Sequence, residues 1–177
     1  VKLATRLLIL TGLRPGELRQ GKWSEIDFDK QLWEVPPERM KKRRPHCVPL
    51  SEQAINILEQ IKPITGRYEY IFPGRVHHTK PMSEMAMNVL FRRIGYGGRV
   101  TGHGFRHTMS TILHEQGYNT AWIETQLAHV DKNSIRGTYN HAQYLDGRRE
   151  MLQWYADYMD ALEHRENVIH GAFGKGA

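Results

Sequence analysis

The stretch "TGHGFRHTMST" (residues 101–111) contains two histidines and an arginine within one and a half helical turns. His103 and His107 are four residues apart, so one face of a helix would present both to a metal ion. His103 and Arg106 are three apart, so the same helix would present an imidazole and a guanidinium to a phosphate. Zinc-protease helices carry a glutamate directly after the first histidine, where this chain has Gly104. We therefore interpret the stretch as half of a phosphate clamp and expect His107 to be hydrogen-bonded scaffolding beneath the helix.

A metal site would also need a third ligand. The remaining candidates are His77, His78 and His129. A guanidinium at position 106 would repel a metal ion unless an anion bridged the two. A metal-dependent histidine nuclease is therefore the least favoured alternative.

The composition agrees with an anionic partner. The 177 residues include 25 Lys and Arg against 19 Asp and Glu, a net charge of +6, and such a basic balance favours nucleic acid. Cys47 is the single cysteine, which excludes an internal disulfide and favours a reducing compartment. Apolar runs are shorter than the roughly 20 residues of a membrane span, so no membrane partner is expected. Val1 stands directly inside an apolar-periodic segment, so we expect the chain to be part of a longer protein.

Apolar spacing predicts mostly helices. A helix over 2–11 should stop at Gly12, and Pro15 suits the first turn of the next one. Strands over 32–35 and 46–50 should form a hairpin, with a third strand around 70–72. Further helices are expected from Ser51, Ser83, Thr101, Asn119 and Ser134. In the helix after Ser83 the expected apolar stripe is Met85, Val89, Leu90 and Ile94; in the last helix it is Leu152, Tyr155, Met159 and Leu162, widened by Met151, Trp154 and Tyr158. The predicted fold is mainly α with a small three-stranded antiparallel sheet at one edge (α+β).

The tip of the predicted hairpin is strongly basic. "MKKRRP" (40–45) places Lys41, Lys42, Arg43 and Arg44 in succession. Arg43 and Arg44 are candidates for DNA backbone contacts, against the alternative of a solvated charged face. Lys41 and Lys42 are candidates for delivering a proton, because a lysine pKa shifts readily on desolvation.

Arg14 and Tyr139 have side chains that suit binding and attack of a phosphate. Arg14 lies in the turn of "LRPGELRQGKW" (13–23), where its planar fork suits bidentate phosphate contact and Glu17, one turn later, can hold it. Tyr139 stands between the polar Thr138 and Asn140, so its hydroxyl can face a cleft. A phenol surrounded by cations becomes a usable nucleophile when a base takes its proton.

In chain order these elements are TGLRPGEL, a basic hairpin, HGFR, LAH and a tyrosine in a C-terminal helix. This ordered set closely resembles the catalytic domain of the tyrosine recombinases, the phage-integrase family, over roughly residues 2–160. The resemblance implies the tyrosine-recombinase catalytic-domain fold, with 1–165 as the catalytic domain and 166–177 as a disordered tail. It also implies that the family's N-terminal DNA-binding domains are missing from this chain.

The resemblance assigns roles to individual residues. Arg14 is similar to the family's first catalytic arginine and Glu17 to the acidic residue that supports it. His103 and Arg106 resemble the family's His-x-x-Arg pair. The other roles fall on Lys41, with Lys42 as a substitute, on His129, which follows Ala128 where glycine is common, and on Tyr139, with Tyr144 as a weaker rival nucleophile.

What the resemblance implies is a site-specific integrase that cuts and rejoins DNA through a 3′-phosphotyrosine, without metal, ATP or other cofactor. Its expected partner is double-stranded DNA at attachment sites, on which monomers would form a synaptic tetramer with the help of host bending or directionality factors. The expected location is the bacterial cytoplasm, at the nucleoid. The last helix would pack either within its own domain or on a neighbouring protomer. Alternatives are DNA relaxation of the type IB topoisomerase kind and a DNA-binding module without catalysis.

Overall fold

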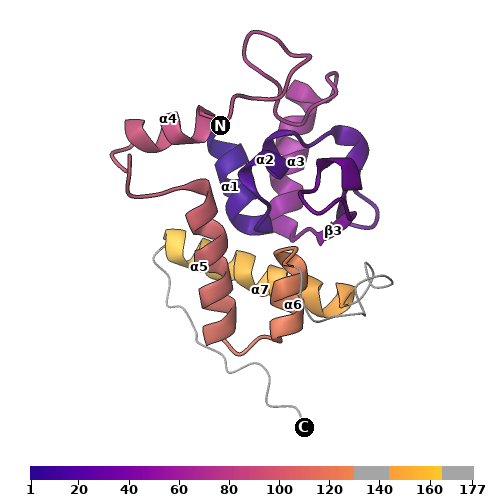
Figure 1. Cartoon of the computed structure of the whole chain (residues 1–177), viewed down its shortest axis with the longest axis vertical. Helices are drawn as coiled ribbons and strands as arrows, with labels where there is room; N and C mark the ends of the chain where they lie inside the picture. Colours follow the sequence, from indigo (N-terminus) through magenta and orange to yellow (C-terminus); the bar gives the residue numbers. More distant parts are fainter. Residues whose placement is uncertain (130–143, 165–177) are drawn as a thin grey trace.

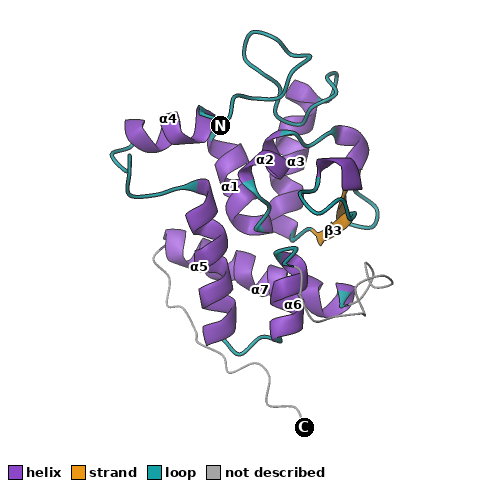
Figure 2. Ribbon diagram, in the orientation of Figure 1, coloured by secondary structure: helices purple, strands orange, loops and turns teal. Residues whose placement is uncertain are grey.

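The computed structural model describes residues 1–129 and 144–164. The elements in chain order are α1 (Lys2–Thr11), α2 (Pro15–Arg19), η1 (Trp23–Glu25), β1 (Ile26–Asp27), β2 (Leu32–Val35), η2 (Pro37–Arg39), β3 (His46–Pro49), α3 (Glu52–Thr65), α4 (Ala86–Arg93), α5 (Gly102–Glu115), α6 (Thr120–Gln126) and α7 (Leu145–His164). Among these elements, α1, α2 and α3 form one group of helices and α5, α6 and α7 a second, and β3 lies to one side where the two groups meet (Figure 1). The predicted fold class is confirmed: helices dominate (Figure 2), and the described residues include a small three-stranded antiparallel sheet.

Helix boundaries follow local chemistry. Gly12 ends α1 in the left-handed conformation, with φ 62°. Ser51 and Asn119 cap α3 and α6 by accepting hydrogen bonds from the backbone N–H groups of Ala54 and Ala121, at 3.3 and 2.8 Å. The predicted starts of these two helices are therefore confirmed.

The sheet has the order β1-β2-β3, with Trp33 opposite Val48 and Val35 opposite His46 in the hairpin. Its third strand is Ile26–Asp27, so the prediction of a strand around 70–72 was wrong. Tyr70 forms an isolated bridge with Lys22 instead. The aromatic-rich segment does pair in an extended conformation, but it pairs with the residues preceding η1 rather than with the hairpin.

Two apolar clusters hold the described chain together. The first joins α1, α2, α3 and the sheet around the fully buried Trp33, and the second joins α5, α6 and α7 around Met109 and Tyr155. Thr11 and Gly12, at the end of α1, lie where the two clusters meet, because a Cβ on Gly12 would come within 2.6 Å of the Met109 Sδ. The turns that join α1 to α2 and close α6 are thus placed side by side.

Two predicted apolar stripes need correction. Helix α4 begins at Ala86 and buries Met87 and Phe91, whereas Met85 and Ile94 are more than half exposed. In α7, Met151, Leu152 and Tyr155 are buried as expected, but Leu162 is half exposed. Trp154 and Met159 pack against the second cluster, to which Met151, Leu152 and Tyr155 belong, so much of the wide stripe packs within this chain.

Three other findings concern what the fold contains. No described helix is long and apolar enough to cross a membrane. The sequence predicts a helix from Ser134 onward and a disordered tail over 166–177. The described part of that helix is α7, whereas residues 134–143 and 166–177 lie outside the described residues. Cys47 is a half-buried strand residue with a free thiol.

Candidate functional site

Arg106 lies at the centre of the candidate site. It stands in the second turn of α5, which Thr101 caps by accepting a hydrogen bond from the Gly104 N–H at 3.0 Å. Its side chain is only 8 % exposed and donates to the carbonyl oxygens of Gly12 and, at 2.6 Å, of Leu127. Burial, and then the charge of Arg14, lower the pKa of Arg106 to about 10, so the guanidinium stays charged at neutral pH.

Arg14 approaches the same turn from α2. As the N-cap residue of α2 it has extended backbone, and its N–H donates to the Glu17 carboxylate at 2.8 Å. The other carboxylate oxygen of Glu17 accepts from the Arg14 guanidinium at 2.7 Å, which is the contact expected from the sequence. A second guanidinium nitrogen reaches the Ala128 carbonyl at 3.5 Å. Glu17, 5 % exposed, thus both caps the helix and aims the arginine.

Both arginines therefore converge on the turn that follows α6. Leu127 and Ala128 supply the accepting carbonyls, and Ala128 has a left-handed φ of 46°. His129 comes next, exposed, with its Nδ1 2.8 Å from the Glu124 carboxylate. That carboxylate holds the proton on Nδ1 and leaves Nε2 as the nitrogen that can meet a ligand.

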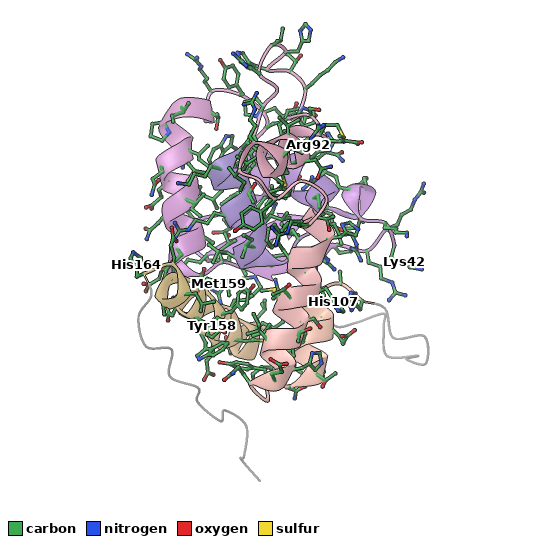
Figure 3. All side chains as sticks on the ribbon, turned by 90° about the vertical axis from the view of Figure 1, so that its left-hand side faces the viewer. Lys42, Arg92, His107, Tyr158, Met159 and His164 are labelled. Atoms are coloured by element: carbon green, nitrogen blue, oxygen red, sulfur yellow. The ribbon has the colours of Figure 1, made fainter. Side chains whose placement is uncertain are left out.

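The two histidines of the α5 motif are both exposed. His103 is exposed in the first turn of α5, one turn before Arg106. His107 is exposed on the same helix (Figure 3), so the prediction that it acts as scaffolding beneath the helix was wrong. Packing under this helix comes instead from Gly102, where an added Cβ would lie 2.7 Å from a Pro15 carbon.

The basic tip is exposed throughout. Lys41, Lys42, Arg43 and Arg44 lie in the connection between β2 and β3, and Lys42 extends away from the ribbon (Figure 3). The Arg43 N–H donates to the Met40 carbonyl at 2.9 Å, which forms the turn. Both lysines keep the access to a ligand that a proton donor needs, so the choice between Lys41 and Lys42 stays open.

Tyr139, the predicted nucleophile, lies outside the described residues. Its rival Tyr144 is the first described residue after them, is 43 % exposed and has φ 68°. Tyr155 is buried in the second cluster, and burial raises the pKa of its phenol, which suits packing and not nucleophilic attack.

Sequence reasoning missed several buried polar residues beneath the arginines. His46 is buried and its Nε2 is 3.0 Å from the Gln126 carbonyl. Burial, the charge of Arg148 and the more distant Arg106 and Arg14 lower the pKa of His46 to about 3, so the ring is neutral and donates from Nε2. Gln126 and Arg148 are each 1 % exposed. The sequence offered a weak signal only for Gln126, which stands beside the LAH motif.

The arrangement suits binding of an anion. Arg106 is held by carbonyl oxygens, which direct a guanidinium without neutralising it; of these two arginines, Arg14 alone has a carboxylate partner among the described residues. Fixed guanidinium forks match phosphate oxygens well. Across residues 1–129 and 144–164, no group of three or more His, Cys, Asp or Glu side chains is placed to hold a metal ion.

Comparison with known proteins identifies relatives. The model of the phage integrase family matches residues 1–145. Over 173 residues the chain is 44 % identical to the prophage integrase IntA of Escherichia coli (strain K12), covering 96 % of this chain and 42 % of that protein. The chain is also 45 % identical over 159 residues to the integrase of Shigella phage Sf6, covering 89 % of this chain and 41 % of that one. This chain therefore spans about two fifths of the length of these relatives.

Solved structures show the same fold. The integrase from mycobacterium phage Brujita superposes with a TM-score of 0.66 at 20 % identity, covering 94 % of this chain and 54 % of that one. The described helices and the small sheet thus have the fold of the tyrosine recombinase catalytic domain. With the family model matched over most of its length, the chain belongs to the phage integrase family.

Proposed function

We propose that this chain is the catalytic part of a site-specific recombinase that integrates or excises mobile DNA through a covalent tyrosine intermediate. The observation that supports it most is the convergence of Arg14 and Arg106 on the turn 127–129, which also presents His129. Two guanidiniums, Arg106 held by backbone carbonyls and Arg14 held chiefly by Glu17, can bind the nonbridging oxygens of one phosphodiester and stabilise the added charge of its pentavalent transition state.

The remaining roles complete the reaction. The Tyr139 oxygen attacks the phosphorus, the bond to the 5′-oxygen breaks, and a 3′-phosphotyrosine and a 5′-hydroxyl result. Lys41, or Lys42 in its place, protonates the leaving 5′-oxygen, while His103 assists proton transfer near the nucleophile and His129 contacts a nonbridging oxygen. The covalent link retains the phosphodiester's energy, so the reverse step can join a new 5′-hydroxyl without ATP. Fixed cations do here what metal ions do in other phosphoryl-transfer sites.

Double-stranded DNA is the proposed partner. A relative in fold, the Tn1549 transposon integrase, was solved in complex with a circular intermediate DNA and superposes with a TM-score of 0.63 at 20 % identity, covering 84 % of this chain and 57 % of that one. The exposed residues Lys42, Arg43 and Arg44 would contact the DNA backbone. We further propose a monomer that assembles as a tetramer on paired attachment sites, with host bending or directionality factors, at the nucleoid of a bacterial cytoplasm.

A nicked duplex that carries the attachment site tests the proposal. Cleavage at the nick lets the short 5′-hydroxyl fragment diffuse away and traps the covalent adduct, which denaturing gel electrophoresis detects. We expect an adduct that is lost in Tyr139→Phe, kept in the matched variant Tyr144→Phe, and unaffected by a chelator. An adduct that persists in Tyr139→Phe would refute the assignment of the nucleophile, and loss of cleavage in chelator would favour a metal nuclease.

A second arm separates the recombinase from the topoisomerase alternative. With a protein that also has the family's N-terminal DNA-binding domains, a supercoiled plasmid with two attachment sites should yield recombinant products, whereas a plasmid without the site should not be relaxed; this chain by itself should not recombine them. Relaxation of both plasmids without recombinants would favour the topoisomerase reading. Binding without any adduct would favour a non-catalytic module.

A further inference from the structure

Beneath the two site arginines, Gln126 and Arg148 form a buried pair that the proposed reaction does not use. The Arg148 Nε and one terminal nitrogen donate to the Gln126 side-chain oxygen at 3.1 and 2.7 Å, and that terminal nitrogen also donates to the Cys47 carbonyl at 2.7 Å. The Gln126 amide nitrogen donates to the Thr11 carbonyl at 2.7 Å. Three helices and the hairpin strand β3 are thus tied at one point.

The pair runs parallel to the contacts of Arg106. Arg106 bridges the carbonyls of Gly12 and Leu127, while Gln126 bridges from its own position to the carbonyl of Thr11. Each bridge therefore joins the same two backbone segments, 11–12 and 126–127, one residue apart. A shift of the bridge between Gln126 and Thr11 would therefore move the neighbouring carbonyls to which Arg106 and Arg14 donate.

The chemistry of Arg148 fits such a role. Its guanidinium is 1 % exposed and held by an amide and a carbonyl, and burial lowers its pKa to about 10. A buried cation of this kind is costly unless its hydrogen bonds are made. Its donors hold a single arrangement of the Gln126 side chain, because an amide flip would set the Gln126 nitrogen against them and the Gln126 oxygen against the Thr11 carbonyl oxygen.

We propose that Arg148, acting through Gln126, is a positioning residue that fixes the turn 127–129 and thereby aims Arg106 and Arg14 at the phosphate. This inference rests on the proposed function for its kinetic consequence, but not for its structural one. The neighbour Arg149 provides the matched control, since it lies next in the chain on α7 and donates to the Lys30 carbonyl at the surface.

The kinetic test compares Arg148→Met, Arg148→Lys and Arg149→Met as whole chains. At saturating DNA we expect Arg148→Met to slow adduct formation more than about tenfold, Arg149→Met to stay within about twofold, and Arg148→Lys to recover part of the loss. In an Arg106→Lys background, Arg148→Met should cost less than about threefold more, because both act on one turn. Equal losses in both backgrounds would show a general loss of folded enzyme and overturn the proposal.

A second measurement needs no DNA. The backbone N–H groups of Leu127, Ala128 and His129 donate to the carbonyl oxygens of Ile123, Thr125 and Glu124 in α6, at 2.9, 3.1 and 2.9 Å. Arg148→Met should raise their hydrogen–deuterium exchange rates about tenfold or more while α3 keeps its rates. Unchanged exchange in the turn, or an equal rise in α3, would refute the inference. If the wild-type chain forms no adduct, the proposed function fails and the exchange result alone decides the role of Arg148.

Discussion

Replacing Glu17 with glutamine tests how the first arginine of the site is held. Glu17 accepts two hydrogen bonds from Arg14, one from the backbone N–H at 2.8 Å and one from the guanidinium at 2.7 Å. Glutamine keeps a single carbonyl oxygen, so it can keep the helix cap or the side-chain contact, but not both as they stand. It also removes the negative charge that partly offsets the positive charges of the two site arginines.

The magnitude follows from these two contacts. A hydrogen bond to a charged group contributes about 1.5–3 kcal/mol, and loss of a helix cap costs about 1 kcal/mol. Because glutamine keeps one of the two bonds, we expect unfolding to need about 1–3 kcal/mol less free energy. If the Arg14 guanidinium is no longer held in its direction, the rate of adduct formation should fall by about 10- to 100-fold, since losing one donor to the transition state lowers a rate by up to about 10²–10³-fold.

The matched control is Glu84→Gln. Glu84 forms an ion pair at 2.5 Å with Arg19, which lies in α2 together with Glu17. The Glu84 side chain is 78 % exposed, so this pair should contribute little to the free energy of unfolding. Urea unfolding and single-turnover adduct formation on the nicked duplex measure the two effects. If Glu17→Gln slows the adduct no more than Glu84→Gln does, the reasoning that Glu17 aims Arg14 is refuted.

Two further predictions concern residues around the arginines. The pKa of His46, lowered to about 3 by burial and by Arg148, lies below its usual value near 6.5, so between these values the unfolded chain binds a proton that the folded chain does not. The free energy of unfolding should therefore fall by up to about 1.4 kcal/mol per pH unit below pH 6.5. His46→Gln keeps a donor for the Gln126 carbonyl, and urea unfolding at several pH values should show a smaller slope of free energy against pH for this variant. Equal slopes would contradict this. Ala128→Gly should stabilise the chain by up to about 1 kcal/mol, because the left-handed φ of 46° strains alanine more than glycine; a lower melting temperature would count against that strain.

The sequence predicted best what lies within one element. Glu17 follows Arg14 by one turn and Arg106 follows His103 by one turn, so helical spacing alone placed each pair. Gly12, Ser51 and Asn119 marked helix boundaries for the same local reason. The strand around Tyr70 was misplaced because β-favouring composition predicts an extended conformation but not the pairing partner, which proved to be Lys22.

Long-range partners were beyond local reasoning. Arg148 and Arg149 are adjacent and chemically identical, yet one is buried on Gln126 and the other donates to Lys30 at the surface. Arg148 lies three and four residues before Met151 and Leu152, so helical spacing places it on the buried face of α7, but no spacing rule shows that it meets Gln126 there. The exposure of His107 and the burial of Met87 in α4 have the same origin in tertiary packing.

The way the arginines are held explains how a site can be rigid and still free to bind. A guanidinium has five N–H donors, and Arg106 uses its two terminal nitrogens on backbone carbonyls. Had carboxylates held it, its charge would be neutralised and a phosphate would have to displace them. Carbonyl oxygens fix its direction and leave its net charge for the ligand. Arg14 is the exception: its single carboxylate partner, Glu17, also caps α2 and offsets part of the positive charge of the two guanidiniums. The balance of one carboxylate against two aimed cations is what a site needs if it is to bind an anion whose charge increases during the reaction.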